Sequence, residues 1–175
     1  MSAEAGLSPA PEGAFDHQGV TALESPTHAS GARWAIVSAR FNGGITDALF
    51  QGAVETLLAA DARPEHIVAV TVPGAVELPL AVRELAHTRD FAGIIALGCV
   101  IRGETAHFDY VCRAATDGLM RVQLDLHIPI GFGVLTVENL AQAEARAQLA
   151  SGGHNVGADA AAAAIELAGL IRVTR

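Results

Sequence analysis

The sequence predicts a three-layer α/β domain built on a four-stranded parallel sheet. Short apolar runs alternate four times with segments of helical period, which is the pattern of repeated βα units. The run from Ile94 to Ile101 has almost no polar alternation, as expected of a strand that helices cover on both faces. Glycine-containing turns follow the apolar runs, so each strand can lead into a crossover helix.

The composition fits one globular domain after an N-terminal arm. The chain has 175 residues, 51% of them hydrophobic but only 5% aromatic, which indicates a core of Ala, Val, Leu and Ile. Residues 1–30 are small and polar without a hydrophobic period, so we expect a mobile arm there and a single domain over residues 31–175.

The charge and the missing targeting signals limit the partners. A net charge of −8 argues against nucleic acid or an anionic membrane as the main partner. No apolar run reaches the length of a membrane span, and no basic and apolar leader begins the chain. Two cysteines make a poor disulfide framework, so we expect a cytoplasmic protein.

The first two βα units follow the arm. Residues 33–39 predict a strand, and the turn from Arg40 to Gly44 leads into a helix over residues 45–60. Residues 67–72 predict the second strand. A helix resumes near Glu77, where Pro79 is tolerated because the first helical N–H groups have no intrahelical partner.

The next two units carry most of the polar residues of interest. The strand over residues 94–101 runs into Arg102, and an apolar stripe predicts a helix over residues 108–126. A fourth strand over residues 128–135 is followed by Thr136, which we expect to cap a helix from residue 138 to 150 that includes Arg146. The last predicted helix covers residues 158–170.

Two phosphate-binding motifs are almost present. Residues 98–105 spell G-x-x-x-x-G-E-T, but Glu104 places a negative charge where a P-loop needs Lys. Backbone N–H groups at this helix start can still hold one phosphate, and an ordinary βα turn is an equal alternative. Gly131 and Gly133 form only G-x-G, which does not support a dinucleotide site.

All eleven basic residues are Arg, so chemistry through a lysine Schiff base is excluded. G-x-S-x-G, H-E-x-x-H and paired C-x-x-C patterns are absent, so serine-hydrolase and zinc sites have no support. These patterns therefore give no support for a zinc site or for a cofactor bound through lysine.

Three side chains fall after strands, at the edge where parallel sheets bind ligands. Phe41 can present its ring to a planar ligand or can simply cap the core. Glu77 lies at the mouth of the same edge, or serves only as a helix N-terminal charge. His107 opens a helix and can accept a proton near neutral pH.

Four blocks together resemble the lumazine synthase family: Arg40-Phe41-Asn42, VPGAVELP over residues 72–79, ALGCVIRGETAHFDY over residues 96–110, and FGVLT over residues 132–136 with Glu138-Asn139. The similarity spans about residues 33–170 in the family's order. It implies a flavodoxin-like fold and a transferase that uses neither a metal nor a cofactor. That enzyme condenses 5-amino-6-(D-ribitylamino)uracil with 3,4-dihydroxy-2-butanone 4-phosphate to 6,7-dimethyl-8-ribityllumazine, the penultimate step of riboflavin biosynthesis. The alternative is a non-catalytic lumazine- or flavin-binding protein on the same fold.

The resemblance also implies roles for individual residues. His107 is the expected proton-transfer residue. The expected ribitylaminouracil site comprises Phe41, Asn42, Ala75, Val76, Glu77, Cys99, Val100, Ile101 and Phe132, with Phe41 and Phe132 around the pyrimidine ring. The expected butanone phosphate site comprises Gly103, Glu104, Thr105 and Arg146, with Glu104 contributing its backbone N–H.

Assembly is likewise implied by the resemblance. The family forms pentamers, and some members close into sixty-subunit shells. Phe41, Glu77 and His107 would come from one subunit, and Phe132 and Arg146 from its neighbour. Asn155-Val156-Gly157 carries Val where the family commonly has Lys, with His154 as a near substitute. The link from Arg146 to Asn155 is longer than the common pattern, which favours a pentamer or a pair of pentamers over a shell.

Overall fold

A computed structural model of the chain describes residues 25–88 and 90–174. Strands and helices alternate along it, as expected. The elements are β1 (Trp34–Ala39), α1 (Gly43–Ala59), β2 (Ile67–Val72), α2 (Leu78–His87), β3 (Gly93–Ile101), α3 (His107–Leu126), β4 (Ile130–Val137), α4 (Leu140–Glu144) and α5 (Val156–Val173). Short 3₁₀ turns, η1 (Pro64–His66) and η2 (Ala75–Glu77), precede β2 and α2.

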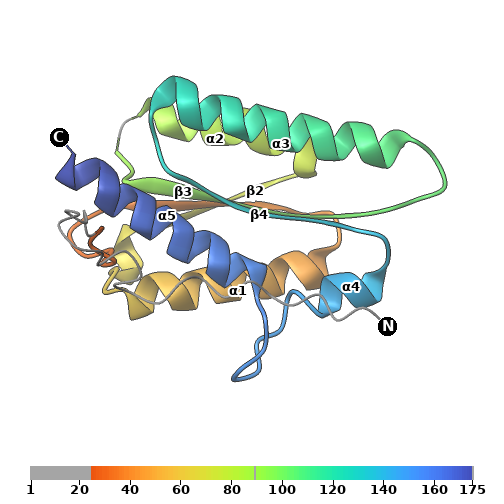
Figure 1. Cartoon of the computed structure of the whole chain (residues 1–175), viewed down its shortest axis with the longest axis horizontal. Coiled ribbons are helices and arrows are strands. Elements are labelled where there is room, and N and C mark those ends of the chain that lie inside the picture. The colour runs from red at the N-terminus through yellow and green to blue at the C-terminus, as the bar shows by residue number, and fades with distance from the viewer. Residues whose placement is uncertain (1–24, 89, 175) are drawn as a thin grey trace, which may run out of the picture.

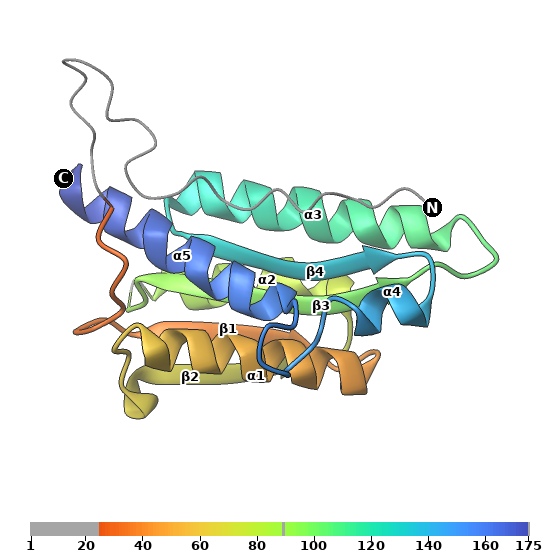
Figure 2. The ribbon, with the colours of Figure 1, turned by 60° about the horizontal axis from the view of Figure 1, so that its bottom comes forward.

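The four strands form one parallel sheet in the order β2-β1-β3-β4. Helices α2 and α3 lie together on one face of this sheet, and α1 and α5 lie on the other (Figure 1). The turned view shows α5 beside α1 with the sheet behind them (Figure 2). The predicted three-layer, flavodoxin-like arrangement is therefore confirmed.

The central strands are apolar because they face a helical layer on each side. All six residues of β1 are buried. Trp34 and Ile36 pack toward α1 and α5, whereas Ala35 and Val37 pack toward α2 and α3. Side chains of successive strand residues point to opposite faces, so a strand between two helical layers needs an apolar residue at every position.

The G-x-G sequence in β4 serves helix packing. A Cβ atom at Gly131 would overlap the main-chain carbonyl of Ala160 in α5. At Gly133 it would press on the side chains of Leu97 and Ala160. These glycines let α5 approach the sheet closely, which gives the motif a structural role without a nucleotide.

The helix predicted over residues 138–150 is wrong in its extent. Only α4, of 5 residues, forms there, and Arg146 lies in the turn that follows. The predicted cap is also wrong, because Thr136 belongs to β4 and Asn139 is the N-cap, accepting from the N–H of Gln142 at 3.0 Å.

The cause of the early helix end lies at Asn155, a residue with 7% of its surface exposed. Its side-chain amide donates to the carbonyl of Gln148 at 3.3 Å, and the N–H of Val156 donates to the carbonyl of Arg146 at 2.9 Å. A continued helix would need these two carbonyls for its own ladder.

Part of the expected arm packs against the domain. Ala29 is 1% exposed, its N–H donates to the carbonyl of Ala60, and its carbonyl accepts from the Trp34 indole at 3.1 Å. The packed chain thus begins before residue 31, and residues 1–24 of the expected arm lie outside the described residues. Across the described ranges, each helix is too short or too polar to cross a membrane.

Candidate active site

The topology leaves a crevice at the carboxyl ends of β1 and β3. These strands are neighbours, but β1 continues into α1 on one face of the sheet, whereas β3 continues into α3 on the other. Connections that diverge in this way open a space between the loops, and open parallel sheets bind their ligands there.

A cavity of about 640 Å³ occupies this crevice. Segments that follow β1, β2 and β3 line it. The predicted site residues in its walls are Phe41, Asn42, Ala75, Val76, Glu77, Cys99, Val100, Ile101, Gly103, Thr105 and His107. The structure therefore gathers residues from three separate sequence blocks around one space.

The wall after β1 is an exposed aromatic ring beside a strained turn. Phe41 is 75% exposed, so its ring does not cap the core. Asn42 has a left-handed backbone with φ 58°. Its side-chain amide donates to the carbonyl of Cys99 at 2.9 Å, which fixes this wall to the end of β3.

The wall after β2 is the 3₁₀ turn η2. The Glu77 carboxylate accepts from the N–H of Gly74 at 2.8 Å and closes the turn. From the sequence, only a helix N-terminal charge was considered as the structural role of Glu77, whereas this contact is a capping hydrogen bond. Through it, the carboxylate stabilises the turn that presents Ala75 and Val76 to the cavity.

The wall after β3 holds His107 as the first residue of the 20-residue helix α3. Thr105 accepts from the His107 N–H through its hydroxyl at 3.4 Å. Gly103 and Thr105 line the cavity, but Glu104 between them does not. The cavity therefore meets the N-terminal end of a helix, the kind of site that binds anions.

The Cys99 thiol is not an available nucleophile. The residue is 3% exposed, and burial raises the pKa of its thiol from 9.0 to about 11. The thiol therefore stays protonated near neutral pH, whereas a cysteine nucleophile must be a thiolate. Cys99 contributes to the site through its carbonyl, which holds Asn42.

Two predicted site residues lie away from the cavity. Phe132 is on the edge strand β4 and is 41% exposed. Arg146 follows α4, where its guanidinium donates to the carbonyl of Gln142 at 3.1 Å. His154, the expected substitute for the missing Lys, has Nε2 2.8 Å from a carboxylate oxygen of Asp159. One chain therefore supplies only part of the predicted site.

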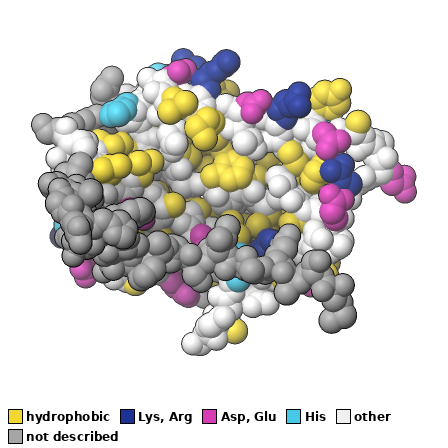
Figure 3. Space-filling model, viewed as in Figure 1, with side chains coloured by type: hydrophobic (Ala, Val, Ile, Leu, Met, Phe, Trp, Pro, Cys, Tyr) yellow, Lys and Arg dark blue, Asp and Glu magenta, His cyan; other side chains and the backbone are white. Residues whose placement is uncertain are grey.

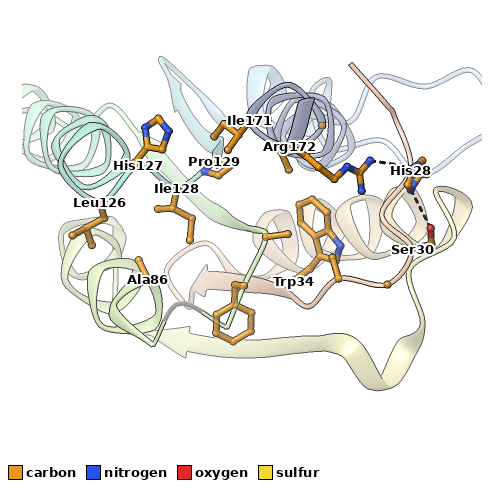
Figure 4. Close-up of a pocket in the computed structure, with 16 residues that line it drawn as sticks. His28, Ser30, Trp34, Ala86, Leu126, His127, Ile128, Pro129, Ile171 and Arg172 are labelled. Carbon is orange, nitrogen blue, oxygen red and sulfur yellow. Dashed lines mark hydrogen bonds between the residues drawn. The ribbon is translucent and has the colours of Figure 1, made fainter. Parts of the chain in front are cut away.

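A second cavity, of about 510 Å³, lies at the opposite end of the sheet. In it His28 sits between Arg172 and Ser30, with ring nitrogens 3.1 Å and 3.0 Å from their polar atoms (Figure 4). Trp34 and Ile128 form part of its apolar wall. None of the predicted site residues lines it, so the crevice between β1 and β3 is the candidate active site.

Comparison with known proteins identifies the family. Residues 31–172 match the model of the 6,7-dimethyl-8-ribityllumazine synthase family. The chain is 45% identical to the 6,7-dimethyl-8-ribityllumazine synthase of Salinibacter ruber over 151 residues, which are 86% of this chain and 96% of that protein. The chain belongs to the lumazine synthase family. The protein of the same name from Lawsonia intracellularis is also 45% identical, over 82% of this chain and 90% of its own length.

Membership confirms the transferase activity expected of a lumazine synthase, the condensation in riboflavin biosynthesis. Among the described residues, no three His, Cys, Asp or Glu side chains gather as a metal site would require.

Sequence reasoning missed four residues of the lumazine synthase cavity. Pro73 and Gly74 precede η2, while Phe108 and Val111 lie in the first turns of α3. A signal was present for the last two, since positions 107, 108 and 111 share one side of a helix. The apolar stripe was used only to predict the helix, whereas the first turns of α3 also form part of the cavity wall.

Proposed function

We propose that the crevice between β1 and β3 binds the ribitylaminouracil and is where the condensation takes place. The observation that carries the proposal is that Phe41 and His107, from blocks far apart in the sequence, line the same cavity. An exposed ring suits stacking on a flat pyrimidine. Main-chain groups of Ala75, Val76 and the end of β3 suit the amide-like edge of that ring.

The reaction needs positioning and proton transfer more than a protein nucleophile. The 5-amino group of the uracil attacks the butanone carbonyl, and loss of water gives an imine. Elimination of phosphate follows, and attack of the ribitylamino nitrogen on the second carbonyl closes the ring with loss of a second water. Because the attacking amine belongs to the substrate, a chain without Lys is competent. Holding two substrates in register accounts for effective molarities of about 10⁵ M or more.

We assign the proton transfers to His107. It stands at the first residue of α3, beside the loop that carries Gly103 and Thr105. Imine formation and phosphate elimination both move protons at the butanone carbon chain. The His107 side chain lines the same cavity as Phe41, so it can transfer protons in both steps.

The phosphate is assigned to the loop between β3 and α3. Gly103 and Thr105 supply N–H groups at the positive end of a long helix. Glu104 lies outside the lining, so its carboxylate does not oppose the phosphate there. Arg146 adds a charge-assisted contact from the neighbouring subunit.

A cyclic homo-oligomer completes the site in this proposal. Large apolar side chains are exposed on α2, α3 and β4, among them Leu80 at 66%, Tyr110 at 71%, Leu124 at 70% and Phe132 at 41%. Figure 3 shows apolar side chains gathered over β4 and the neighbouring surface of α3. Such a surface is typical of a contact between subunits. A head-to-tail contact repeated around a ring then brings Phe132 and Arg146 of one chain to the cavity of the next.

A pentamer, or a pair of pentamers, is the proposed assembly. The long link between α4 and α5 projects from the body of the subunit (Figure 1). Its Gln148 N–H donates to the carbonyl of His154 at 3.0 Å, which holds the projection in shape. We expect such a projection to obstruct the tighter contacts of a closed shell. Sedimentation as a megadalton particle would contradict the proposed pentamer. The cytoplasmic location of the protein stays a prediction.

Activity is tested by mixing the purified protein with both substrates and following lumazine absorbance. An enzyme gives a rate above the slow spontaneous condensation and proportional to protein concentration. A binding protein on the same fold would change the spectrum of added lumazine without raising that rate.

A further inference from the structure

Arg102, the first residue after β3, bridges two carboxylates from different parts of the chain. Its Nε donates to both carboxylate oxygens of Glu138, at 3.0 Å and 2.8 Å. Its Nη2 lies 3.2 Å from Oδ1 of Asp109, and its Nη1 3.5 Å from Oδ2. Three guanidinium nitrogens are thus engaged, by one residue after β4 and one in the first turn of α3.

The same guanidinium lies over an aromatic ring of the active-site wall. Its Cζ is 4.0 Å from the centroid of the Phe108 ring, within the range of a cation–π contact. Phe108 lines the cavity and directly follows His107. Arg102 itself is not part of the lining, and of the side chains it contacts only Phe108 lines the cavity.

These contacts close the loop of residues 103–107 at both ends. Arg102 stands at the start of the loop, where its N–H donates to the carbonyl of Val137 at 2.9 Å. Phe108 and Asp109 stand at its end. All five residues between are exposed, and the loop projects from the molecule at the end that carries α4 (Figure 1). A projecting, exposed segment needs ties at its two ends to keep one conformation.

We propose that Arg102 is a positioning residue for the condensation, which holds the loop of residues 103–107 so that His107 and the loop N–H groups meet the second substrate. The proposal rests on the roles assigned to His107 and this loop above. It adds a residue that touches neither substrate, and whose effect passes through Phe108, Asp109 and Glu138.

The tie to Glu138 reaches a second part of the site. The Glu138 N–H donates to the Gln142 side chain at 2.8 Å, and the Gln142 carbonyl accepts from Arg146 at 3.1 Å. Arg102 therefore links the loop that carries His107 to the turn that carries Arg146. In a ring of subunits these two segments serve neighbouring cavities, so one guanidinium orders parts of both.

The side chains of Arg102, Asp109 and Glu138 are exposed, so the effect of Arg102 on loop position can be distinguished from an effect on folding. The Arg102, Asp109 and Glu138 side chains are 38%, 61% and 57% exposed, and exposed ion pairs contribute little to stability. Loss of Arg102 should leave the folded state intact and change the loop. Lys should replace it only in part, because one ammonium group cannot reproduce the planar set of donors.

The test compares Arg102→Ala and Arg102→Lys with Arg33→Ala as a matched control. Arg33 also pairs with an exposed carboxylate, that of Asp90 at 3.6 Å, and lies 5.1 Å over the Phe91 ring, but it is remote from the active-site cavity. For each variant, kcat, KM for both substrates, melting temperature and hydrogen exchange of residues 102–109 are measured.

We expect Arg102→Ala to lower kcat about 10- to 100-fold, the scale of a small misplacement of reacting groups. The KM for the ribitylaminouracil and the melting temperature should hardly change. Exchange in residues 102–109 should become several-fold faster. Arg102→Lys should recover part of kcat, and Arg33→Ala should behave as wild type in every measurement.

Wild-type kcat in Arg102→Ala would overturn the proposal, whatever the exchange shows, and so would unchanged exchange in that variant. The exchange measurement needs no turnover, so it stands even if the wild-type protein fails to condense the substrates. If Arg102→Ala does not fold, Glu138→Gln removes one partner at nearly constant shape. Glu138→Gln should then show a lower kcat and faster hydrogen exchange in residues 102–109. A wild-type value for either quantity would overturn the proposal.

Discussion

The side-chain amide of Asn42 donates a hydrogen bond to the main-chain carbonyl of Cys99 at 2.9 Å, and so ties the turn after β1 to the end of β3. Both residues line the crevice. Asn42 also has a left-handed backbone, with φ 58°, which Asn and Gly adopt more readily than other residues. One residue therefore adopts the left-handed turn conformation and also joins two segments of the cavity wall.

Substitution of Asn42 separates these two contributions. Asn42→Gly keeps the backbone conformation accessible and loses the hydrogen bond, at about 1 kcal/mol of unfolding free energy. Asn42→Ala loses the bond and also forces a Cβ into the left-handed region, which costs roughly 1 kcal/mol more. Urea unfolding of both variants measures the difference. If Asn42→Ala is as stable as Asn42→Gly or more stable, the left-handed conformation of residue 42 does not destabilise the Ala variant.

The raised pKa of Cys99 predicts a loss of stability in alkali. The thiol titrates near 9.0 when unfolded and at about 11 in the fold. The neutral form is favoured by folding, so this stabilisation is complete below pH 9 and disappears as the pH rises through 11. Over that interval the unfolding free energy should fall by about 1.4 kcal/mol per pH unit from this group.

Cys99→Ala is the control for that pH dependence. Its stability should decline less steeply between pH 9 and 11 than that of the wild type, because the other groups titrate in both proteins. Its activity at pH 7 should persist, since the site uses the carbonyl of residue 99 and not the thiol. Parallel stability curves for the two proteins would contradict the assignment.

Local pattern was sufficient for most of the fold. The predicted second strand coincides with β2, and the predicted helix over residues 108–126 differs from α3 by one residue at its start. Apolar runs and stripes determine these elements directly. The helix predicted over residues 138–150 failed because an Ala-rich segment favours helix by propensity. Its early end depends on Asn155, which also donates to Ala48 of α1, and such a distant contact has no local signal.

The site was predictable as far as strand ends determine it. Phe41, Ala75 and His107 each follow a different parallel strand, and carboxyl ends of parallel strands share one edge. The ties among these segments were not predictable, since Arg102 meets Glu138 only because β3 and β4 are neighbours. Phe132 and Arg146 were identified by resemblance alone, and their place in a neighbouring cavity stays a prediction.

Arg146→Ala should affect one substrate far more than the other. Only the butanone carries a phosphate, so its KM should rise while that of the uracil stays close to wild type. The lost charge-assisted contacts correspond to about 1.5–3 kcal/mol, or roughly a 10- to 100-fold change. Steady-state kinetics with each substrate varied in turn measures this. A similar rise in both KM values would point to damage elsewhere.

His107→Ala should lower kcat and leave binding of both substrates nearly intact. General acid–base catalysis contributes about 100- to 10,000-fold, and the variant should lose a factor in this range. His87→Ala is the matched control, because His87 is the exposed last residue of α2 and is outside the cavity. Turnover at the wild-type rate in His107→Ala would require another residue for proton transfer.

The two variants together test whether the site is shared between subunits. If His107 and Arg146 act across an interface, chains with His107→Ala and chains with Arg146→Ala can complement each other in one ring. With random co-assembly of equal amounts, about a quarter of the interfaces pair an intact His107 with a neighbour's intact Arg146. Activity should reappear in the co-expressed protein although each variant alone is impaired.

Subunit exchange must be separated from co-assembly. Proteins purified apart and then mixed should keep the average of their individual rates, because exchange between formed rings is slow. Only chains that fold together form hybrid interfaces. If the co-expressed rings are no more active than that average, His107 and Arg146 act within one subunit. The turn that carries Arg146 would then have to move toward the cavity, since Arg146 is not part of its lining in the structure.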